Sequence, residues 1–92
     1  MVNIKTSKAY KKNLKRLSKS GKFNRKILVE ILEKILSNTA LEEKRKDHQL
    51  NGTLARLREC HIESDLLLIY EFDKDSNILH LVNIGSHSDL FE

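Results

Sequence analysis

Apolar residues recur every three to four positions in two stretches of the first half of the chain, a spacing typical of amphipathic helices. The first stretch follows Ser7 and ends before Gly21, and the second follows Asn24. Serine and asparagine are favoured N-caps, and glycine suits the left-handed turn after a helix. The apolar positions are Tyr10, Leu14 and Leu17 in the first stretch, and Ile27, Leu28, Ile31, Leu32, Ile35 and Leu36 in the second. We therefore expect two helices, each with one face to bury.

The second half of the chain has the shorter apolar runs of β-strands. Residues 2–5 are expected to form an extended opening. Residues 37–53 lose all periodicity, and "KDHQLNG" at residues 46–52 is expected to form a loop. Three strand-like runs follow, at residues 54–62, 66–72 and 77–84, with connections short enough for antiparallel hairpins. The pattern predicts an α+β domain with an N-terminal strand, a two-helix hairpin, an antiparallel three-stranded meander and a short C-terminal tail or helix. The helices should cover one face of the sheet and leave the other for ligands.

Chain length and cysteine content narrow the class of protein. The 92 residues are expected to form one domain, residues 1–92. The longest apolar stretch, Leu66–Tyr70, is far shorter than the roughly 20 residues of a membrane span, and no apolar segment follows the N-terminal lysines as in a signal peptide. Cys60 is the only cysteine, which excludes an intrachain disulfide. We expect a cytoplasmic protein that does not bind a membrane.

Charge is distributed unevenly along the chain, whose net charge is +4. Residues 1–35 contain eleven Lys or Arg residues and only two acids, whereas residues 36–92 contain six Lys or Arg residues and eleven acids. A basic half on a small chain favours a polyanionic partner, RNA or DNA first, or else an acidic protein. The alternative is that the lysines only keep the two helices soluble.

Three of the four histidines fall where a meander would gather them. His61 ends the first predicted meander strand, Asp65 lies in the following turn, and His87 comes just after the last strand. In an antiparallel meander these positions share one end of the sheet, and the loop with His48 leads towards it. The fourth histidine, His80, lies within an apolar strand and is left out of the predicted site.

Imidazoles with a carboxylate suit RNA cleavage without a cofactor. A base takes the proton of a ribose 2′-hydroxyl, which attacks the neighbouring phosphorus, and an acid protonates the leaving 5′-oxygen; imidazole can serve in either role near neutral pH. Positive charge must also face the phosphate oxygens. The cationic candidates are Lys46, Arg56 and Arg58.

Two other readings use some of the same residues. Three histidines and an aspartate could form a zinc site, but no H-x-x-x-H or C-x-x-C spacing supports it, so we expect no metal. Cys60 next to His61 does not suit a nucleophile pair, since neighbouring side chains of a strand point to opposite faces. Cys60 is expected to be a small buried residue.

Three segments resemble a known family. In order and spacing, "KDHQLNG", "LRECHIESDLLLIYEF" and "IGSHSDLF" are similar to the YafQ branch of the RelE/ParE superfamily of bacterial toxins. The resemblance implies a RelE-like two-layer fold and a ribosome-dependent mRNA endonuclease, an mRNA interferase of a type II toxin–antitoxin system that uses no cofactor. Its partners would be a small acidic antitoxin, the ribosome and mRNA, with operator DNA bound only through the antitoxin complex. The basic first helix would contact ribosomal RNA.

The resemblance carries the family's site onto five positions, which are His48, His61, Asp65, His87 and Phe91. On this basis His87 is expected to be the general acid and either Asp65 or His48 the base. His61 would position the phosphate, Arg58 would supply charge, and Phe91 would pack beside the site or touch a base.

Two positions depart from the family's pattern. Asn83 stands where members usually carry an arginine that faces the scissile phosphate, and Leu66 stands where some members have an aromatic residue. Asparagine brings no charge, so activity could be reduced unless Arg56 or Arg58 compensates. The alternatives are a weakened or inactive relative that acts by binding its antitoxin and operator, or a toxin of the same fold that binds DNA gyrase.

Overall fold

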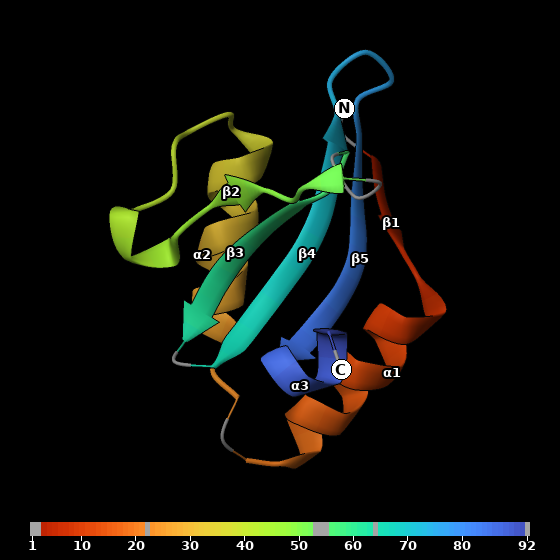
Figure 1. Ribbon diagram of the computed structural model, residues 1–92, viewed down its shortest axis with the longest axis vertical. Helices are drawn as coiled ribbons and strands as arrows, with labels where there is room; N and C mark the ends of the chain where they lie inside the picture. The colour runs from red at the N-terminus through yellow and green to blue at the C-terminus, as the bar shows by residue number, and fades with distance from the viewer. Residues whose placement is uncertain (1–2, 22, 53–55, 64, 92) are drawn as a thin grey trace.

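The computed structural model describes residues 3–21, 23–52, 56–63 and 65–91. The predicted order of elements is confirmed (Figure 1). Its helices and strands are β1 (Asn3–Thr6), α1 (Lys8–Lys19), α2 (Arg25–Leu36), the 3₁₀ turn η1 (Glu43–Arg45), β2 (His48–Gln49), β3 (Arg58–Glu63), β4 (Leu66–Asp73), β5 (Ile78–Ser86) and α3 (His87–Phe91).

Both long helices begin at the predicted caps. The Ser7 hydroxyl accepts a hydrogen bond from the Tyr10 amide at 3.0 Å and donates one to the Val82 carbonyl, so this cap also ties α1 to β5. The Asn24 side chain accepts from the Lys26 amide at 3.0 Å. Gly21 has a φ of +76°, the left-handed conformation expected after α1.

The strands form one five-stranded sheet in the order β1-β5-β4-β3-β2. The antiparallel meander of β3, β4 and β5 is confirmed, and β1 adds to it by parallel pairing with β5. The prediction that residues 46–52 form a loop was wrong at His48 and Gln49, which form the edge strand β2, and the segment before them contains η1. Two paired residues are too few to produce a visible period. The first meander strand begins at Arg58, and residues 54 and 55 of its predicted span lie outside the described residues.

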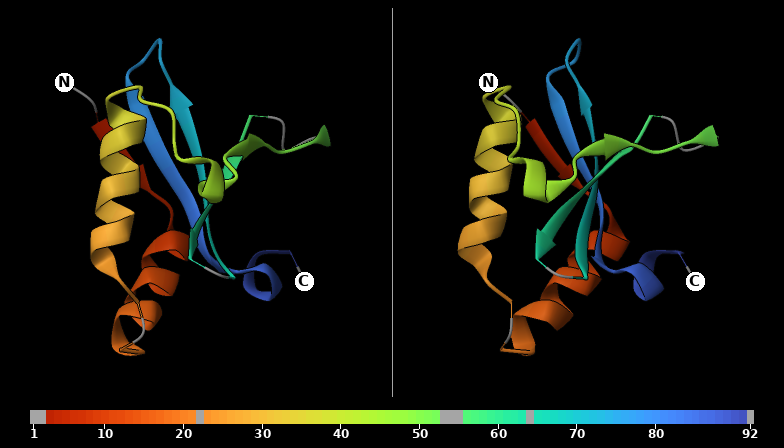
Figure 2. Two further views of the ribbon diagram at one scale, coloured as in Figure 1. Left: turned by 90° about the vertical axis from the view of Figure 1, so that its left-hand side faces the viewer. Right: turned by 60° about the vertical axis from the view of Figure 1, so that its left-hand side comes forward.

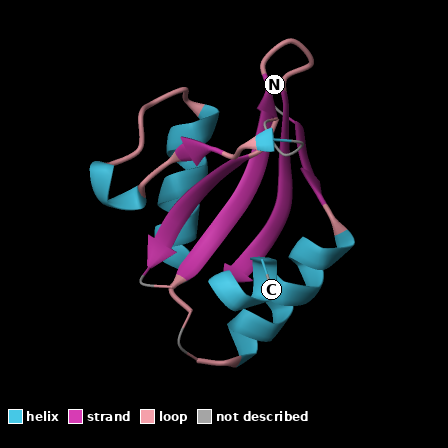
Figure 3. Ribbon diagram, viewed as in Figure 1, coloured by secondary structure: helices cyan, strands magenta, loops and turns pink. Residues whose placement is uncertain are grey.

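The two long helices cover one face of the sheet, and α3 lies on the other side (Figures 2 and 3). The main apolar cluster joins the helices to the sheet and contains Tyr10, Leu28, Ile31, Ile35, Cys60, Ile62, Leu68, Tyr70, Leu79, Leu81 and Ile84. Cys60 is completely buried, and burial raises the pKa of its thiol to about 12, so it is a packing residue as predicted. In the part of the chain that the structure describes, no helix is long and apolar enough to cross a membrane.

Two irregularities interrupt the meander. The register between β3 and β4 shifts between His61 and Glu63, and the register between β4 and β5 shifts opposite Ile69 and Tyr70, leaving Val82 unpaired in the ladder. Bulges of this kind redirect side chains and often lie beside active sites. Here both lie close to the predicted site residues.

Candidate active site

The site lies on the sheet face that α1 and α2 leave uncovered. Cys60 and Ile62 of β3 are fully buried in the core. Because successive residues of a strand project to opposite faces, Glu59 and His61 project away from the helices. Cross-strand partners share a face, so His48, which pairs with Glu59, lies on the same side.

Glu59 joins two of the predicted histidines. One of its carboxylate oxygens lies 3.7 Å from Nε2 of His48 and 3.9 Å from Nε2 of His61. Glu59 is only 4% exposed, and a carboxylate removed from water needs partners of this kind. These contacts are ion pairs when the imidazoles are protonated, so Glu59 can orient both rings and stabilise a proton on either one.

The other predicted pair lies at the end of the sheet. Nδ1 of His87 is 3.9 Å from Oδ1 of Asp65, and the His87 backbone amide donates to the same oxygen at 3.4 Å. Both side chains are exposed, at 61% and 69% of their surface. The predicted proximity of Asp65 and His87 is confirmed, and it depends on the turn after β3 meeting the start of α3.

Strand register relates the two groups of residues. His61 pairs with Leu67, and Leu67 pairs with Gly85, two residues before His87. Two strand spacings put His61 about 10 Å from Gly85 in backbone position. The two histidine–carboxylate groups are therefore close enough to face successive parts of one nucleotide chain, although His61 contacts Glu59 rather than Asp65.

Asn83 occupies the same sheet face. It pairs with Ile69, which pairs in turn with Glu59. Its side-chain oxygen accepts from Nδ2 of Asn13 on α1 at 2.7 Å and from the amide of Ile84 at 2.9 Å. The position at which family members usually carry arginine thus faces the site, and here it is tied to α1.

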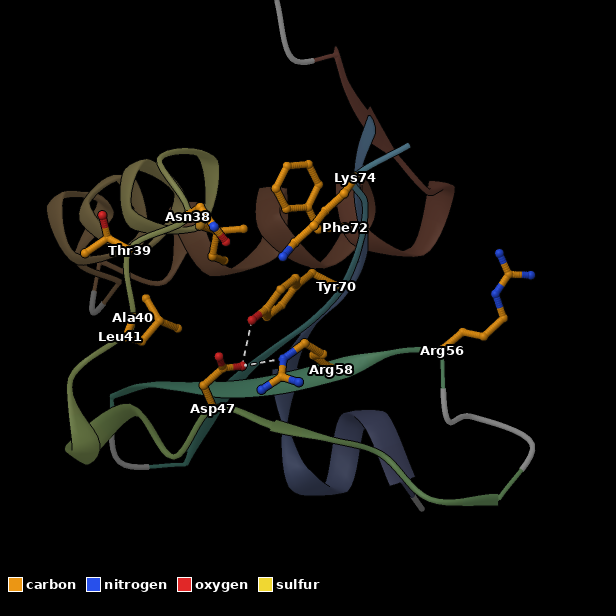
Figure 4. A pocket seen from close by; sticks show the side chains of 11 residues that line it. Asn38, Thr39, Ala40, Leu41, Asp47, Arg56, Arg58, Tyr70, Phe72 and Lys74 are labelled. Atoms are coloured by element: carbon orange, nitrogen blue, oxygen red, sulfur yellow. Dashed lines mark hydrogen bonds and ion pairs between the residues drawn. The ribbon is translucent and has the colours of Figure 1, made fainter. Parts of the chain in front are cut away.

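The structure does not bring Arg58 to the histidines. Arg58 lies on the helix side of β3, where Nε donates to Asp47 at 3.2 Å, and the Tyr70 hydroxyl donates to the same aspartate oxygen at 2.6 Å. Figure 4 shows this group in a pocket of about 420 Å³ between the sheet and the segment after α2. The hydrogen bond to Asp47 holds the pKa of Arg58 above its usual value.

Arg56 also lies away from the two groups. Its Nε is 3.7 Å from a carboxylate oxygen of Glu71, nearer the β4–β5 hairpin. In Figure 4 its side chain points away from Asp47 and Tyr70. Neither predicted arginine therefore compensates for Asn83 at the site in this conformation.

Lys46 is the one predicted cation that lies near the histidines. Its carbonyl contacts Nδ1 of His48 at 2.6 Å, and its exposed side chain lines a pocket together with His61. Lys46 has a φ of +49°, a left-handed turn immediately before Asp47 and His48. The turn lets Asp47 reach the helix side of the sheet while His48 pairs with Glu59 on the other side.

Sequence reasoning missed two residues, Glu59 and Asp47. Glu59 could have been found, since it lies two positions before His61 and must share its face in a strand. Asp47 gave no such signal, because its partners Tyr70 and Arg58 come from strands whose pairing with the loop was not visible. Phe91 ends α3, but its side chain lies outside the structural description.

Among the described residues, no three His, Cys, Asp or Glu side chains are grouped closely enough to hold a metal ion. The two histidine–carboxylate groups have the residue types that can accept and donate protons.

The Tyr70 hydroxyl gives a test of how the histidine loop is anchored. We expect Tyr70→Phe to lower the free energy of unfolding at pH 7 by about 1–2 kcal/mol, because Asp47 loses a buried donor. Burial first, and then the bond to Asp47, raise the pKa of Tyr70 above its usual value. The unfolded phenol therefore ionises at lower pH than the folded one, and stability falls as pH rises above about 10.

Urea unfolding between pH 7 and about pH 11 measures both effects, and the fall above pH 10 should be shallower in Tyr70→Phe. Tyr10→Phe is the matched control at pH 7, since the described residues give the Tyr10 hydroxyl no hydrogen-bond partner. An equal loss of stability in both variants at pH 7 would contradict the anchoring role.

Comparison with known proteins agrees with the fold. The family model described as the bacterial toxin YafQ of a type II toxin–antitoxin system matches residues 2–92. The mRNA interferase toxin YafQ of Escherichia coli K12 is 32% identical over 90 residues, which cover 97% of this chain and 95% of that protein.

Solved structures agree along the whole chain. A metal-bound toxin from Helicobacter pylori is 46% identical with a TM-score of 0.90, covering 99% of this chain and 100% of that chain. A chain of the E. coli DinJ–YafQ toxin–antitoxin complex is 29% identical with a TM-score of 0.86, covering 99% of this chain and 98% of that chain. The protein therefore belongs to the YafQ family of bacterial toxins of type II toxin–antitoxin systems.

Proposed function

We propose that this toxin is a ribosome-dependent mRNA endonuclease that uses acid–base catalysis by its own side chains. The observation that carries the proposal is a pair of histidine–carboxylate groups, one at Glu59 on the uncovered sheet face and one at Asp65 at the end of the sheet. The E. coli relative is named an mRNA interferase, which supports the same substrate class.

The reaction needs one proton acceptor and one proton donor. In our proposal neutral His48, oriented by Glu59, takes the proton of the ribose 2′-hydroxyl as its oxygen attacks phosphorus. The bond from phosphorus to the 5′-oxygen breaks, and protonated His87 gives its proton to that oxygen. The products are a 2′,3′-cyclic phosphate and a 5′-hydroxyl.

The remaining residues support these two. Asp65 orients His87, and we therefore assign the base to His48 rather than to Asp65. His61, held by the Glu59 carboxylate, hydrogen-bonds the phosphate oxygens as charge develops on them. Lys46 supplies positive charge beside His61. We expect no cofactor in this mechanism.

The basic face of α1 is the proposed contact with ribosomal RNA. Its exposed lysines are Lys8, Lys11, Lys12, Lys15 and Lys19. Binding that neutralises phosphates releases counterions, so affinity for ribosomes should fall steeply as salt rises. Action on translating ribosomes also implies a cytoplasmic protein.

An acidic antitoxin is the proposed protein partner. The E. coli relative has been crystallised in complex with the antitoxin DinJ, and the basic first half of this chain suits an acidic segment that folds on binding. Operator DNA would be bound through that complex.

Asn83 favours a second candidate function. It lies on the site's face, and neither Arg56 nor Arg58 reaches that face near the histidines. A toxin without this charge would act mainly by binding its antitoxin and, through it, operator DNA.

Cleavage of a reporter mRNA on programmed bacterial ribosomes, mapped by primer extension, tests the main proposal. We expect cuts within A-site codons, unaffected by EDTA and reduced at least about a hundredfold by His87→Ala, since general acid–base groups contribute 10²–10⁴-fold. Glu59→Gln should also reduce cutting. The matched control is His80→Ala, a histidine of β5 outside both groups. Equal loss in His80→Ala and His87→Ala, or no cuts from folded wild-type protein, would contradict the proposal.

Replacing Asn83 separates the two candidate functions. We expect Asn83→Arg to increase the cleavage rate by about tenfold or more, because a cation would face the crowded phosphate in the transition state. Asn83→Gln is the neutral control, and circular dichroism would confirm that both variants fold. If the wild-type protein cuts RNA and Asn83→Arg does not increase the cleavage rate, the site already has the positive charge that it needs. If the wild-type protein is inactive and Asn83→Arg restores cleavage, the result favours the binding function for the wild type.

A further inference from the structure

Helix α1 packs against β5 and is bonded to residues in the second half of that strand. Strand β1 pairs with β5 only as far as Leu81, which leaves the rest of that edge without a strand. Beyond it the cap residue Ser7 bonds the Val82 carbonyl, and one and a half turns later Asn13 bonds the side chain of Asn83. Arg16, three residues after Asn13 on the same face of the helix, comes next.

Arg16 joins α1 to α3. Its Nη2 is 3.1 Å from Oδ2 of Asp89. The same oxygen of Asp89 accepts from the Ser86 amide at 3.1 Å, and the Ser86 hydroxyl accepts from the Asp89 amide at 3.2 Å. This reciprocal pair is a capping box at the first turn of α3, the turn that carries His87.

The position of α3 depends on contacts outside itself. A helix of five residues is too short to be stable alone. It lies so close to β5 that a Cβ atom on Gly85 would be 3.0 Å from Cβ of Asp89. The ion pair with Arg16 therefore connects the middle of α3 to α1, which covers the other face of the sheet.

We propose that Arg16, through Asp89, is a positioning residue for His87 in RNA cleavage. The inference rests on the proposed nuclease function. Arg16 differs in this respect from its lysine neighbours on α1, which would only bring the protein to the ribosome. Its expected contribution is to the geometry of proton transfer, because an exposed ion pair adds little to global stability.

The test compares binding with chemistry. Arg16→Gln and Lys15→Gln remove the same charge from adjacent positions of α1, so both should weaken ribosome binding to a similar degree. Only Arg16→Gln should lower the cleavage rate at saturating ribosomes, on the order of tenfold, because small misplacements of a reacting group are costly. Arg16→Lys should recover part of the rate.

Asp89→Asn completes a double-mutant cycle with Arg16→Gln, because asparagine keeps an oxygen that accepts from the Ser86 amide but has no negative charge. It should lower the saturated rate as much as Arg16→Gln, and the double variant should be no slower than either single variant. Additive losses, or an equal loss of rate in Lys15→Gln, would overturn the proposal.

NMR provides a readout that does not need cleavage. The amide signals of residues 86–90 and the ring signals of His87 should shift in Arg16→Gln and Asp89→Asn, and remain in place in Lys15→Gln. Unchanged signals in all three variants would refute the positioning role even if the protein is an active nuclease. Shifted signals in a protein that does not cut RNA would show that the nuclease function, rather than the coupling of α1 to α3, is wrong.

Discussion

Cys60 and Ile62 of β3 are fully buried against the helices, and strand geometry therefore turns Glu59 and His61 to the opposite face. The apolar core and the candidate site thus depend on the same six residues of backbone. A shift of one residue in the register of β3 would bury His61 and expose the core. In the segment "ECHI", Cys60 and Ile62 pack in the apolar core, whereas Glu59 and His61 form part of the candidate site.

The loop before β3 is also fixed by contacts on both faces of the sheet. Asp47 accepts hydrogen bonds from Tyr70 and Arg58 on the helix side, and the next residue, His48, pairs with Glu59 on the site side. Likewise, α1 packs along β5 with one face and presents its lysines with the other. The proposed base His48 and the proposed acid His87 come from the short elements β2 and α3, and each imidazole lies next to a carboxylate, Glu59 or Asp65.

Local patterns were enough to predict the helices, their caps, the meander and the meeting of Asp65 with His87. They failed where long-range pairing decides the outcome. The strand at His48 has only two residues, and its partner strand begins only at Arg58. Arg58 was assigned to the site because it is basic and near in sequence, but the two-residue period places it on the helix side with Asp47. The same period would have identified Glu59. The bulge at Val82 decides which face of the sheet Asn83 lies on, and the local sequence does not predict this bulge.

The most direct measurement is an electron cryomicroscopy structure of the toxin on a programmed ribosome, with a 2′-O-methyl group at the scissile nucleotide to prevent cleavage. Our account predicts that the A-site codon lies on the uncovered sheet face, with the scissile phosphate between His87 and the imidazoles held by Glu59, and α1 against ribosomal RNA. A codon bound on the helix side beside Arg58 and Asp47, or a scissile phosphate out of reach of His87, would contradict it.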